Sequence, residues 1–154
     1  MRRQKTAQDV ADIIERFLNE ISLYPQEWND FVECTEPDPR LEAFRKRCEV
    51  LDPLVNSHLP EDPNAIAELR TMVKELRYLQ FAEILQNFLH GAGGEWDWDD
   101  FASAMSFEDP YLERIRTRCI LLDREFPPAR LGEYCNEQGL EVVRAYIREL
   151  TKST

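Results

Sequence analysis

The chain has 154 residues, of which 43% are hydrophobic and 32% are charged, a composition typical of a globular protein rather than a disordered one. Its 30 acidic and 19 basic residues give a formal net charge of −11, which argues against direct binding to nucleic-acid phosphates or to anionic lipid surfaces. No stretch approaches the roughly 18 apolar residues of a membrane span, and the basic residues 1–5 run into an acidic amphipathic segment instead of a secretory signal.

The four cysteines are far apart and form no CxxC motif, which argues against a zinc site or a redox pair. In a chain with no export signal we expect reduced thiols and a cytoplasmic location. The four residues are Cys34, Cys48, Cys119 and Cys135.

Glycine is scarce, at 5, and the prolines fall between apolar runs, a punctuation that predicts an all-α protein. The first helix is predicted over residues 6–22, beginning with a capping box formed by Thr6 and Asp9. Its apolar residues recur with the 3.6-residue period of a helix and are Val10, Ile13, Ile14, Phe17, Leu18 and Ile21.

A short helix that holds Trp28 is predicted next, followed by a longer one that begins at Asp38-Pro39. An acidic N-cap directly before a proline at the first helical position is a recognised start signal. Asp62-Pro63 begins another helix, and no helix breaker separates it from a further apolar stripe that begins at Phe81. The sequence leaves open whether residues 63–90 form one helix or two.

The second half of the chain repeats the first. Residues 38–52 (DPRLEAFRKRCEVLD) and 109–123 (DPYLERIRTRCILLD) are identical at nine of fifteen positions, at an offset of 71. The match extends upstream, where Trp28-Asn29-Asp30-Phe31 corresponds to Trp98-Asp99-Asp100-Phe101 at an offset of 70. Identity at this level is far above the few per cent per position expected by chance.

This repetition predicts a helical bundle built from two tandem, pseudo-symmetric copies of a helical unit of roughly 70 residues. The copies span about residues 6–78 and 79–151 of a single domain, 1–154, with a C-terminal helix over residues 140–150. We expect the two copies to share one core, because either half alone would be marginally stable.

Residue types that usually carry catalysis are scarce. His58 and His90 are the only histidines, and the chain has no GxSxG, Gly-rich phosphate loop or HExxH motif. Cys48 and Cys119 fall on apolar stripes, where a cysteine behaves as a small hydrophobic residue. An EF-hand interpretation of residues 97–108 fails, because the position that needs glycine is an alanine. We therefore predict no catalytic residue, no metal and no cofactor.

Acidic residues gather at the same place in each copy. Five acids and no base occur between residues 27 and 38, and six acids and no base between residues 95 and 109. We predict that these segments form two acidic edges that bind a partner, with Trp96 as an aromatic anchor; the alternative is a Trp96 partly buried under a solvated loop. The predicted binding residues are Glu27, Asp30, Glu33 and Glu36 in the first copy and Glu95, Trp96, Asp97, Asp99 and Asp100 in the second.

The recurrent Asp30 and Asp100 allow two interpretations. Either they pair with arginines of the following helix, Arg45 or Arg47 in the first copy and Arg116 or Arg118 in the second, or they line a polar groove.

These features favour an acidic interaction module that masks a basic surface of a partner protein, such as an immunity or antitoxin-type protein that neutralises a nuclease-type toxin, or another inhibitor. A DNA mimic that occupies a nucleic-acid-binding protein is a neighbouring hypothesis. The alternatives are a structural or regulatory scaffold that forms a homodimer or larger homo-oligomer, and an enzyme that uses an Asp/Arg groove.

Overall fold

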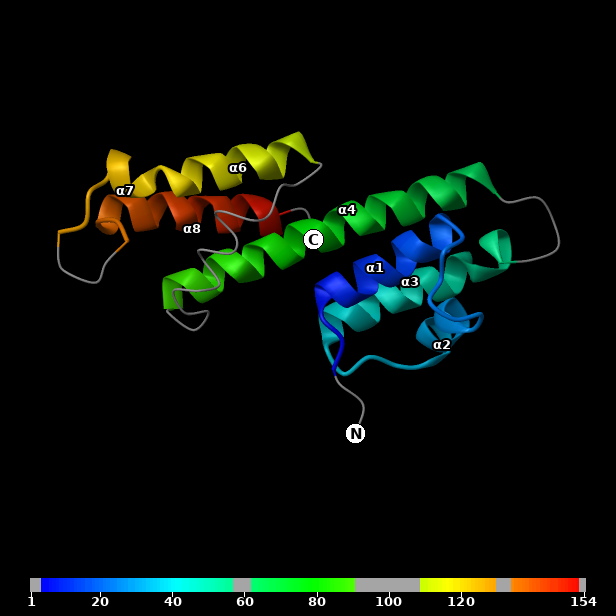
Figure 1. The fold of residues 1–154 in the computed structure, drawn as a ribbon. Helices are drawn as coiled ribbons and strands as arrows, with labels where there is room; N and C mark the ends of the chain where they lie inside the picture. Colours follow the sequence, from blue (N-terminus) through cyan, green and yellow to red (C-terminus); the bar gives the residue numbers. More distant parts are fainter. Residues whose placement is uncertain (1–3, 57–61, 91–108, 130–133, 153–154) are drawn as a thin grey trace. The chain divides into compact units, whose positions relative to one another are not determined.

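A computed structural model of the chain describes residues 4–56, 62–90, 109–129 and 134–152 (Figure 1). Every regular element in these ranges is a helix, so the all-α prediction is confirmed for the described part of the chain. None of these helices is long and apolar enough to cross a membrane. The chain divides into two compact units, Met1–Gln80 and Phe81–Thr154. A core shared between them stays a prediction.

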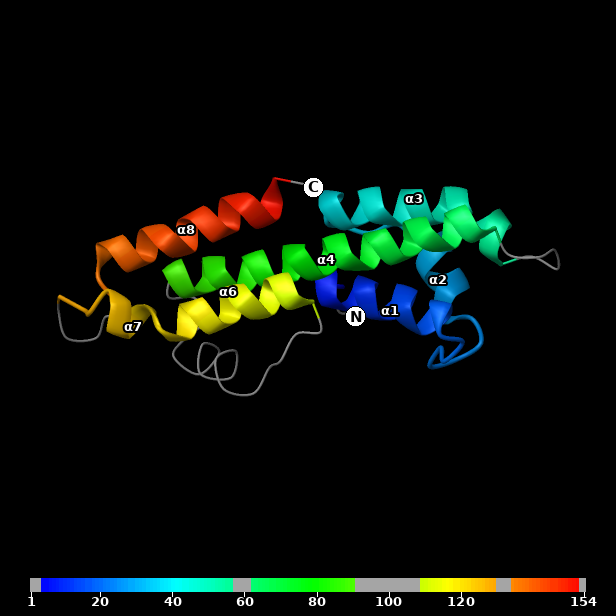
Figure 2. The ribbon, with the colours of Figure 1, turned by 90° about the horizontal axis from the view of Figure 1, so that it is seen from above.

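The first unit contains α1 (Ala7–Leu18), α2 (Glu27–Glu33), α3 (Pro39–Val55) and the first part of α4 (Pro63–His90). Helices α1 and α3 both lie below that part of α4 in the view of Figure 1 and on either side of it when seen from above (Figure 2), so the three helices are arranged as a triangle. Helix α2 packs against both α1 and α3. The open question about residues 63–90 is settled, because they form one helix.

The core of the first unit receives side chains from all four helices. Each buried aliphatic or aromatic side chain contributes about 1.5–3 kcal/mol relative to an exposed one, so this cluster is the main source of the unit's stability. Its fully buried members include Val10, Ile14, Phe31, Leu41, Cys48, Leu69, Met72 and Leu76.

The predicted start of α1 is confirmed. Thr6 Oγ1 accepts a hydrogen bond from the backbone N–H of Asp9 at 3.2 Å, and the backbone N–H of Thr6 donates to Asp9 Oδ2 at 2.9 Å. The same interpretation is confirmed for α3 and α6 (Pro110–Ile120), where Asp38 and Asp109 accept from backbone N–H groups of the first turn. In each case the pattern is local, with donor and acceptor within three residues.

The predicted end of α1 at residue 22 is wrong, because the helix ends at Leu18. Glu20 adopts a left-handed conformation with φ of 59°, and its N–H donates to Phe17 O while the N–H of Ile21 donates to Arg16 O. These two bonds form a Schellman motif, in which glycine usually occupies the position that Glu20 holds. Ile21 therefore leaves the predicted apolar stripe and is 62% exposed.

One proline lies inside a helix, contrary to the expected punctuation. Pro53 occupies the last turn of α3, and the next turn is closed by a hydrogen bond from the N–H of Asn56 to Asp52 O at 2.9 Å. A proline so close to a helix end removes only one backbone hydrogen bond, so the helix continues to Val55.

The second unit contains the rest of α4 together with α6, α7 (Leu122–Glu125) and α8 (Glu137–Thr151). The helix that begins at Pro110 is interrupted at Leu121, which separates α6 from α7. The hydroxyl of Tyr134 donates to the carbonyl oxygens of Cys119 and Ile120, at 3.1 and 2.6 Å. These are two of the carbonyl groups that the next helical turn would use, which accounts for the break.

Gly139, in the first turn of α8, is required by close packing. A Cβ atom at this position would lie 2.7 Å from Cys135 Sγ, 2.9 Å from Cys135 Cβ and 3.2 Å from Phe126 Cβ. We expect Gly139→Ala to lower the free energy of unfolding by about 1–2 kcal/mol, because the clash outweighs a gain of about 1 kcal/mol in helix propensity. Urea denaturation followed by circular dichroism measures the change. Ala145→Gly, at an exposed position of the same helix, calibrates the propensity, and a stabilised Gly139→Ala variant would contradict the packing argument.

Candidate protein-binding site

The predicted binding residues of the second copy, Glu95, Trp96, Asp97, Asp99 and Asp100, lie outside the described residues. Those of the first copy lie on α2 and directly after it. The structure separates these four acids into two buried and two accessible ones.

Glu27 and Glu36 are buried and are not displayed as an acidic edge. Glu27 is 5% exposed and accepts two hydrogen bonds from Arg16 of α1, from Nε to Oε1 at 3.0 Å and from Nη2 to Oε2 at 2.9 Å. Glu36 is 8% exposed and forms an ion pair with Lys5, whose Nζ lies 3.1 Å from Oε1. Sequence reasoning missed these bases because they lie outside the segment in which the charges were counted.

Asp30 is half-buried and Glu33 is exposed, so the accessible part of the first acidic edge consists of these two carboxylates. The predicted pairing of Asp30 with Arg45 or Arg47 is wrong. Arg45 binds Glu42 and Glu49 of its own helix, and Arg47 binds Glu75 and Glu68 of α4. Glu42 and Glu49 lie one turn away from Arg45 on either side, so these two carboxylates pair with it and Asp30 does not.

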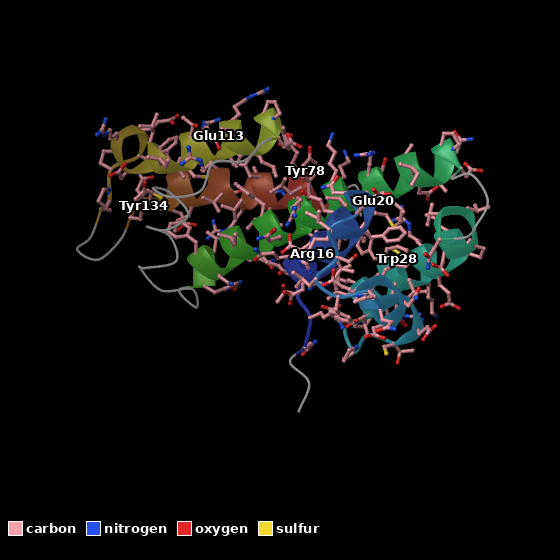
Figure 3. The ribbon with its side chains drawn as sticks, turned by 45° about the vertical axis from the view of Figure 1, so that its right-hand side comes forward. Arg16, Glu20, Trp28, Tyr78, Glu113 and Tyr134 are labelled. Atoms are coloured by element: carbon pink, nitrogen blue, oxygen red, sulfur yellow. The ribbon has the colours of Figure 1, made fainter. Side chains whose placement is uncertain are left out.

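A groove of about 440 Å³ runs between α1 and α2, and Asp30 forms part of its wall. Leu23 and Tyr24, from the loop of residues 19–26, are exposed residues of its lining, and we call them its mouth. Arg16, labelled in Figure 3, lies on its α1 side and is held there by Glu27. The other lining residues are Lys5, Asp9, Ile13, Leu23, Tyr24 and Phe31.

The ionic contacts inside the groove leave one carboxylate uncompensated. The hydrogen bond from Arg16 to Glu27 raises the pKa of Arg16, because it stabilises the charged guanidinium, and it gives the charge of Arg16 a carboxylate partner within the groove. Lys5 is held by Glu36, and Asp9 accepts from the backbone of Thr6. Among the described residues, no side chain or backbone group forms an ion pair or hydrogen bond with the carboxylate of Asp30, which lines the groove without a basic partner.

Apolar side chains surround this carboxylate at the mouth of the groove. Leu23 is 73% exposed and Tyr24 is 45% exposed, and both line the groove together with Asp30. Ile21 lies in the same loop. Contiguous exposed apolar residues next to charged ones are typical of protein interaction sites. The sequence did not indicate this surface, because it placed Ile21 inside a helix.

A second exposed apolar surface lies on α3. Val50 and Leu54 are one turn apart and are 75% and 46% exposed. Leu121, the residue that corresponds to Val50 in the second copy, is 43% exposed and lines a groove of about 490 Å³ along α6. The same position of the repeat is therefore apolar and exposed in both units.

The cysteines on the predicted apolar stripes are core residues, as expected. Cys48 and Cys119 are fully buried, and burial raises the pKa of each thiol to about 12. Cys135 is also buried, whereas Cys34 is half-buried. Among the described residues, no group of three or more His, Cys, Asp or Glu side chains is placed to hold a metal ion.

We expect one of the four thiols to react readily in the folded protein. An aromatic disulfide reagent at pH 8 should modify Cys34 and leave the three buried cysteines untouched until denaturant is added, because the thiolate is the reactive form. Absorbance of the released chromophore counts the thiols. Cys34→Ala should abolish the rapid release of chromophore from the native protein. Rapid modification of two or more thiols in the native protein would contradict the assigned burial.

Comparison of the chain with protein-family models, with curated proteins and with solved structures gives no match. A half-buried carboxylate beside exposed apolar side chains suits a cationic group carried on an apolar stem.

Proposed function

We propose that this protein is an acidic interaction module that binds a basic surface of a partner protein and masks it. The observation that carries the proposal is the surface of α2 and the preceding loop, where the exposed Leu23 and Tyr24 line the same groove as Asp30. Glu33 is exposed at the end of the same helix. An apolar centre with a charged rim is the usual anatomy of a protein interface.

The distribution of charge supports attraction to a basic partner. Residues 1–80 contain 16 acids and 11 bases, and residues 81–154 contain 14 acids and 8 bases, so each half is negative by itself. Such a field accelerates encounter with a positively charged protein. A cytoplasmic immunity or antitoxin-type protein that covers the substrate-binding surface of a nuclease-type toxin is the form we favour. A DNA mimic acting on a nucleic-acid-binding protein is its nearest variant.

We also propose that the two halves are pseudo-symmetric copies of one ancestral unit within a single domain. Matching interactions at the repeat offset of 71 support this: Asp38 and Asp109 cap their helices, and Arg45 and Arg116 each bind the glutamate three residues earlier. The acidic segment of the second copy, residues 95–109, would then provide a second interaction edge.

The experiment that tests masking is capture of binding proteins from a lysate of the native host at low and high salt. The test variant is Asp30→Asn/Glu33→Gln, and the matched control is Asp123→Asn/Glu149→Gln, which removes the same charge from exposed positions elsewhere. The proposal is supported if the native protein retains a basic protein at low salt and releases it at high salt. The test variant should fail to retain that protein, and the control variant should still retain it. If both variants lose the captured protein equally, the binding is non-specific charge attraction. If the native protein captures no basic protein, the masking proposal is contradicted.

The exposed apolar residues of α3 favour a second candidate function, a homo-oligomeric scaffold. Val50 and Leu54 present an uncovered apolar turn, and such a turn is a natural contact for another copy of the chain. Sedimentation in 0.05 and 1 M NaCl tests it. If the protein is a homo-oligomeric scaffold, it should self-associate at both salt concentrations, and the variant Val50→Glu/Leu54→Glu should be a monomer. A native protein that is monomeric at both salt concentrations excludes this function.

A further inference from the structure

We propose that the groove between α1 and α2 seats one lysine or arginine side chain of the partner, with its cationic head at Asp30 and its apolar stem against Leu23 and Tyr24. This inference rests on the proposed masking function and assigns it a specific anchoring contact.

The shape of the groove fits a single long side chain. Ile13 and Phe31 close its back, and both are buried, at 7% and 1% exposure. Leu23 and Tyr24 are the exposed apolar residues of the described lining, and a guest side chain would cover them. A volume of about 440 Å³ lies toward the lower end of the ~300–1,000 Å³ of ligand pockets, which leaves room for a side chain but not for a helix.

The charges of the groove select a cation. Both of its bases already have carboxylate partners, since Arg16 is bound by Glu27 through two hydrogen bonds and Lys5 is bound by Glu36. An entering anion would therefore meet Asp30 with no uncompensated base beside it. An entering cation would form a charge-assisted hydrogen bond with the same carboxylate, which is stronger than one between neutral groups.

The apolar mouth selects a cation carried on a stem. A small hydrated ion at Asp30 would leave Leu23 and Tyr24 in water, whereas the methylene chain of lysine or arginine covers apolar surface while its head stays polar. Asp30 lines the groove together with these residues and provides a negatively charged acceptor for the head of such a side chain. Both features of the mouth are matched by a basic side chain of a protein.

The test measures binding of a fluorescein-labelled twelve-residue peptide of alternating lysine and leucine to the full chain, by fluorescence anisotropy at low salt. A peptide of alternating glutamate and leucine is the charge control. We expect the lysine peptide to bind and the glutamate peptide not to bind. Asp30→Asn should weaken binding about tenfold through loss of the charge-assisted hydrogen bond, and Leu23→Ser should weaken it several-fold.

The matched control is Asp123→Asn, which removes one negative charge outside the groove and should change the affinity less than twofold. Circular dichroism and melting curves show whether each variant is folded, and amide chemical shifts of residues 19–33 should move when the native protein binds the peptide. If Asp30→Asn and Asp123→Asn weaken peptide binding equally, the proposed anchoring of a basic side chain in the groove is overturned. General masking by acidic charge would still stand. The anchoring proposal is also overturned if the lysine peptide does not bind, or if the glutamate peptide binds equally well. The capture experiment with host lysate then tests the masking function separately.

Discussion

Replacement of Trp28 by alanine should lower the free energy of unfolding of the first unit by about 4 kcal/mol, the largest effect that we expect from a single substitution. Trp28, labelled in Figure 3, is 3% exposed. It stacks on Phe17 with ring centroids 4.1 Å apart and planes inclined by 13°. Its Nε1 donates to Asp52 Oδ1 at 2.7 Å, which ties α2 to α3. Alanine removes the ring, the stacking and the hydrogen bond together.

Urea denaturation followed by circular dichroism at 222 nm measures this loss. Trp28→Phe serves as the matched variant, because it keeps an aromatic ring against Phe17 but removes the N–H donor to Asp52. We expect it to cost about 1–2 kcal/mol. A loss of less than 1 kcal/mol for Trp28→Ala would show that α2 does not contribute to the cooperative core.

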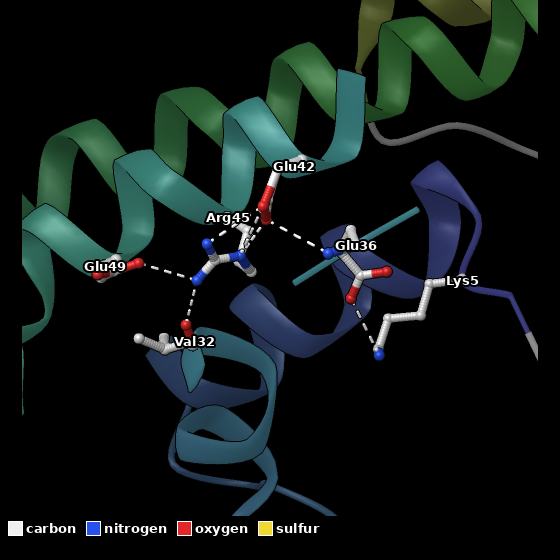
Figure 4. Close-up of polar contacts among 6 residues, drawn as sticks. All are labelled: Lys5, Val32, Glu36, Glu42, Arg45 and Glu49. Atoms are coloured by element: carbon white, nitrogen blue, oxygen red, sulfur yellow. Dashed lines mark hydrogen bonds and ion pairs between the residues drawn. The ribbon is translucent and has the colours of Figure 1, made fainter. Parts of the chain in front are cut away.

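Replacement of Arg45 by alanine should lower the free energy of unfolding by about 3 kcal/mol, because its loss leaves the buried carbonyl oxygen of Val32 and the half-buried carboxylate of Glu42 without their donor. Arg45 is 5% exposed and donates to Glu42, to Glu49 and to the carbonyl oxygen of Val32 at the end of α2 (Figure 4). The hydrogen bond to Glu42 raises the pKa of Arg45, and the same bond lowers the pKa of Glu42.

The second copy provides the control for this substitution. Arg116 binds Glu113 at the same spacing, but its side chain is more exposed, at 16% against 6% for Arg45. Water compensates more of the loss at an exposed site, so Arg116→Ala should cost about 1 kcal/mol. Equal costs for the two variants would contradict the role of burial.

The cost of Arg45→Ala should also depend on pH. Because the folded protein holds the pKa of Glu42 below its ordinary value of 4.5, the stabilisation is complete above that pH and disappears as the pH falls through the lowered pKa. The difference between native protein and variant should therefore shrink in acid. Denaturation at pH 7 and pH 3 measures it, with Arg116→Ala again as the control.

Helix starts could be predicted from the sequence because they depend on neighbours in the chain. The capping box of Thr6 and Asp9 and the Asp-Pro starts of α3 and α6 are formed by groups within three residues of one another. The buried faces could be predicted for a related reason, since a 3.6-residue apolar period determines which side of a helix avoids water. Cys48 and Cys119 were assigned to the core on that basis.

Contacts between helices could not be predicted in this way. Counting charges along α2 gave an unbroken acidic edge, yet Arg16 neutralises Glu27 from another helix and Lys5 neutralises Glu36 from the segment before α1. The uncompensated Asp30 and its neighbours Leu23 and Tyr24 were found only in three dimensions.

By itself, the sequence determined that this is a helical, strongly acidic chain with an internal repeat, and it located most helix starts and buried stripes. The tertiary structure decided which acids remain accessible and where apolar side chains stay exposed. The physical reason is that capping and amphipathic period depend on residues a few positions apart. The charge and exposure of a binding surface depend instead on side chains that folding brings together from different helices.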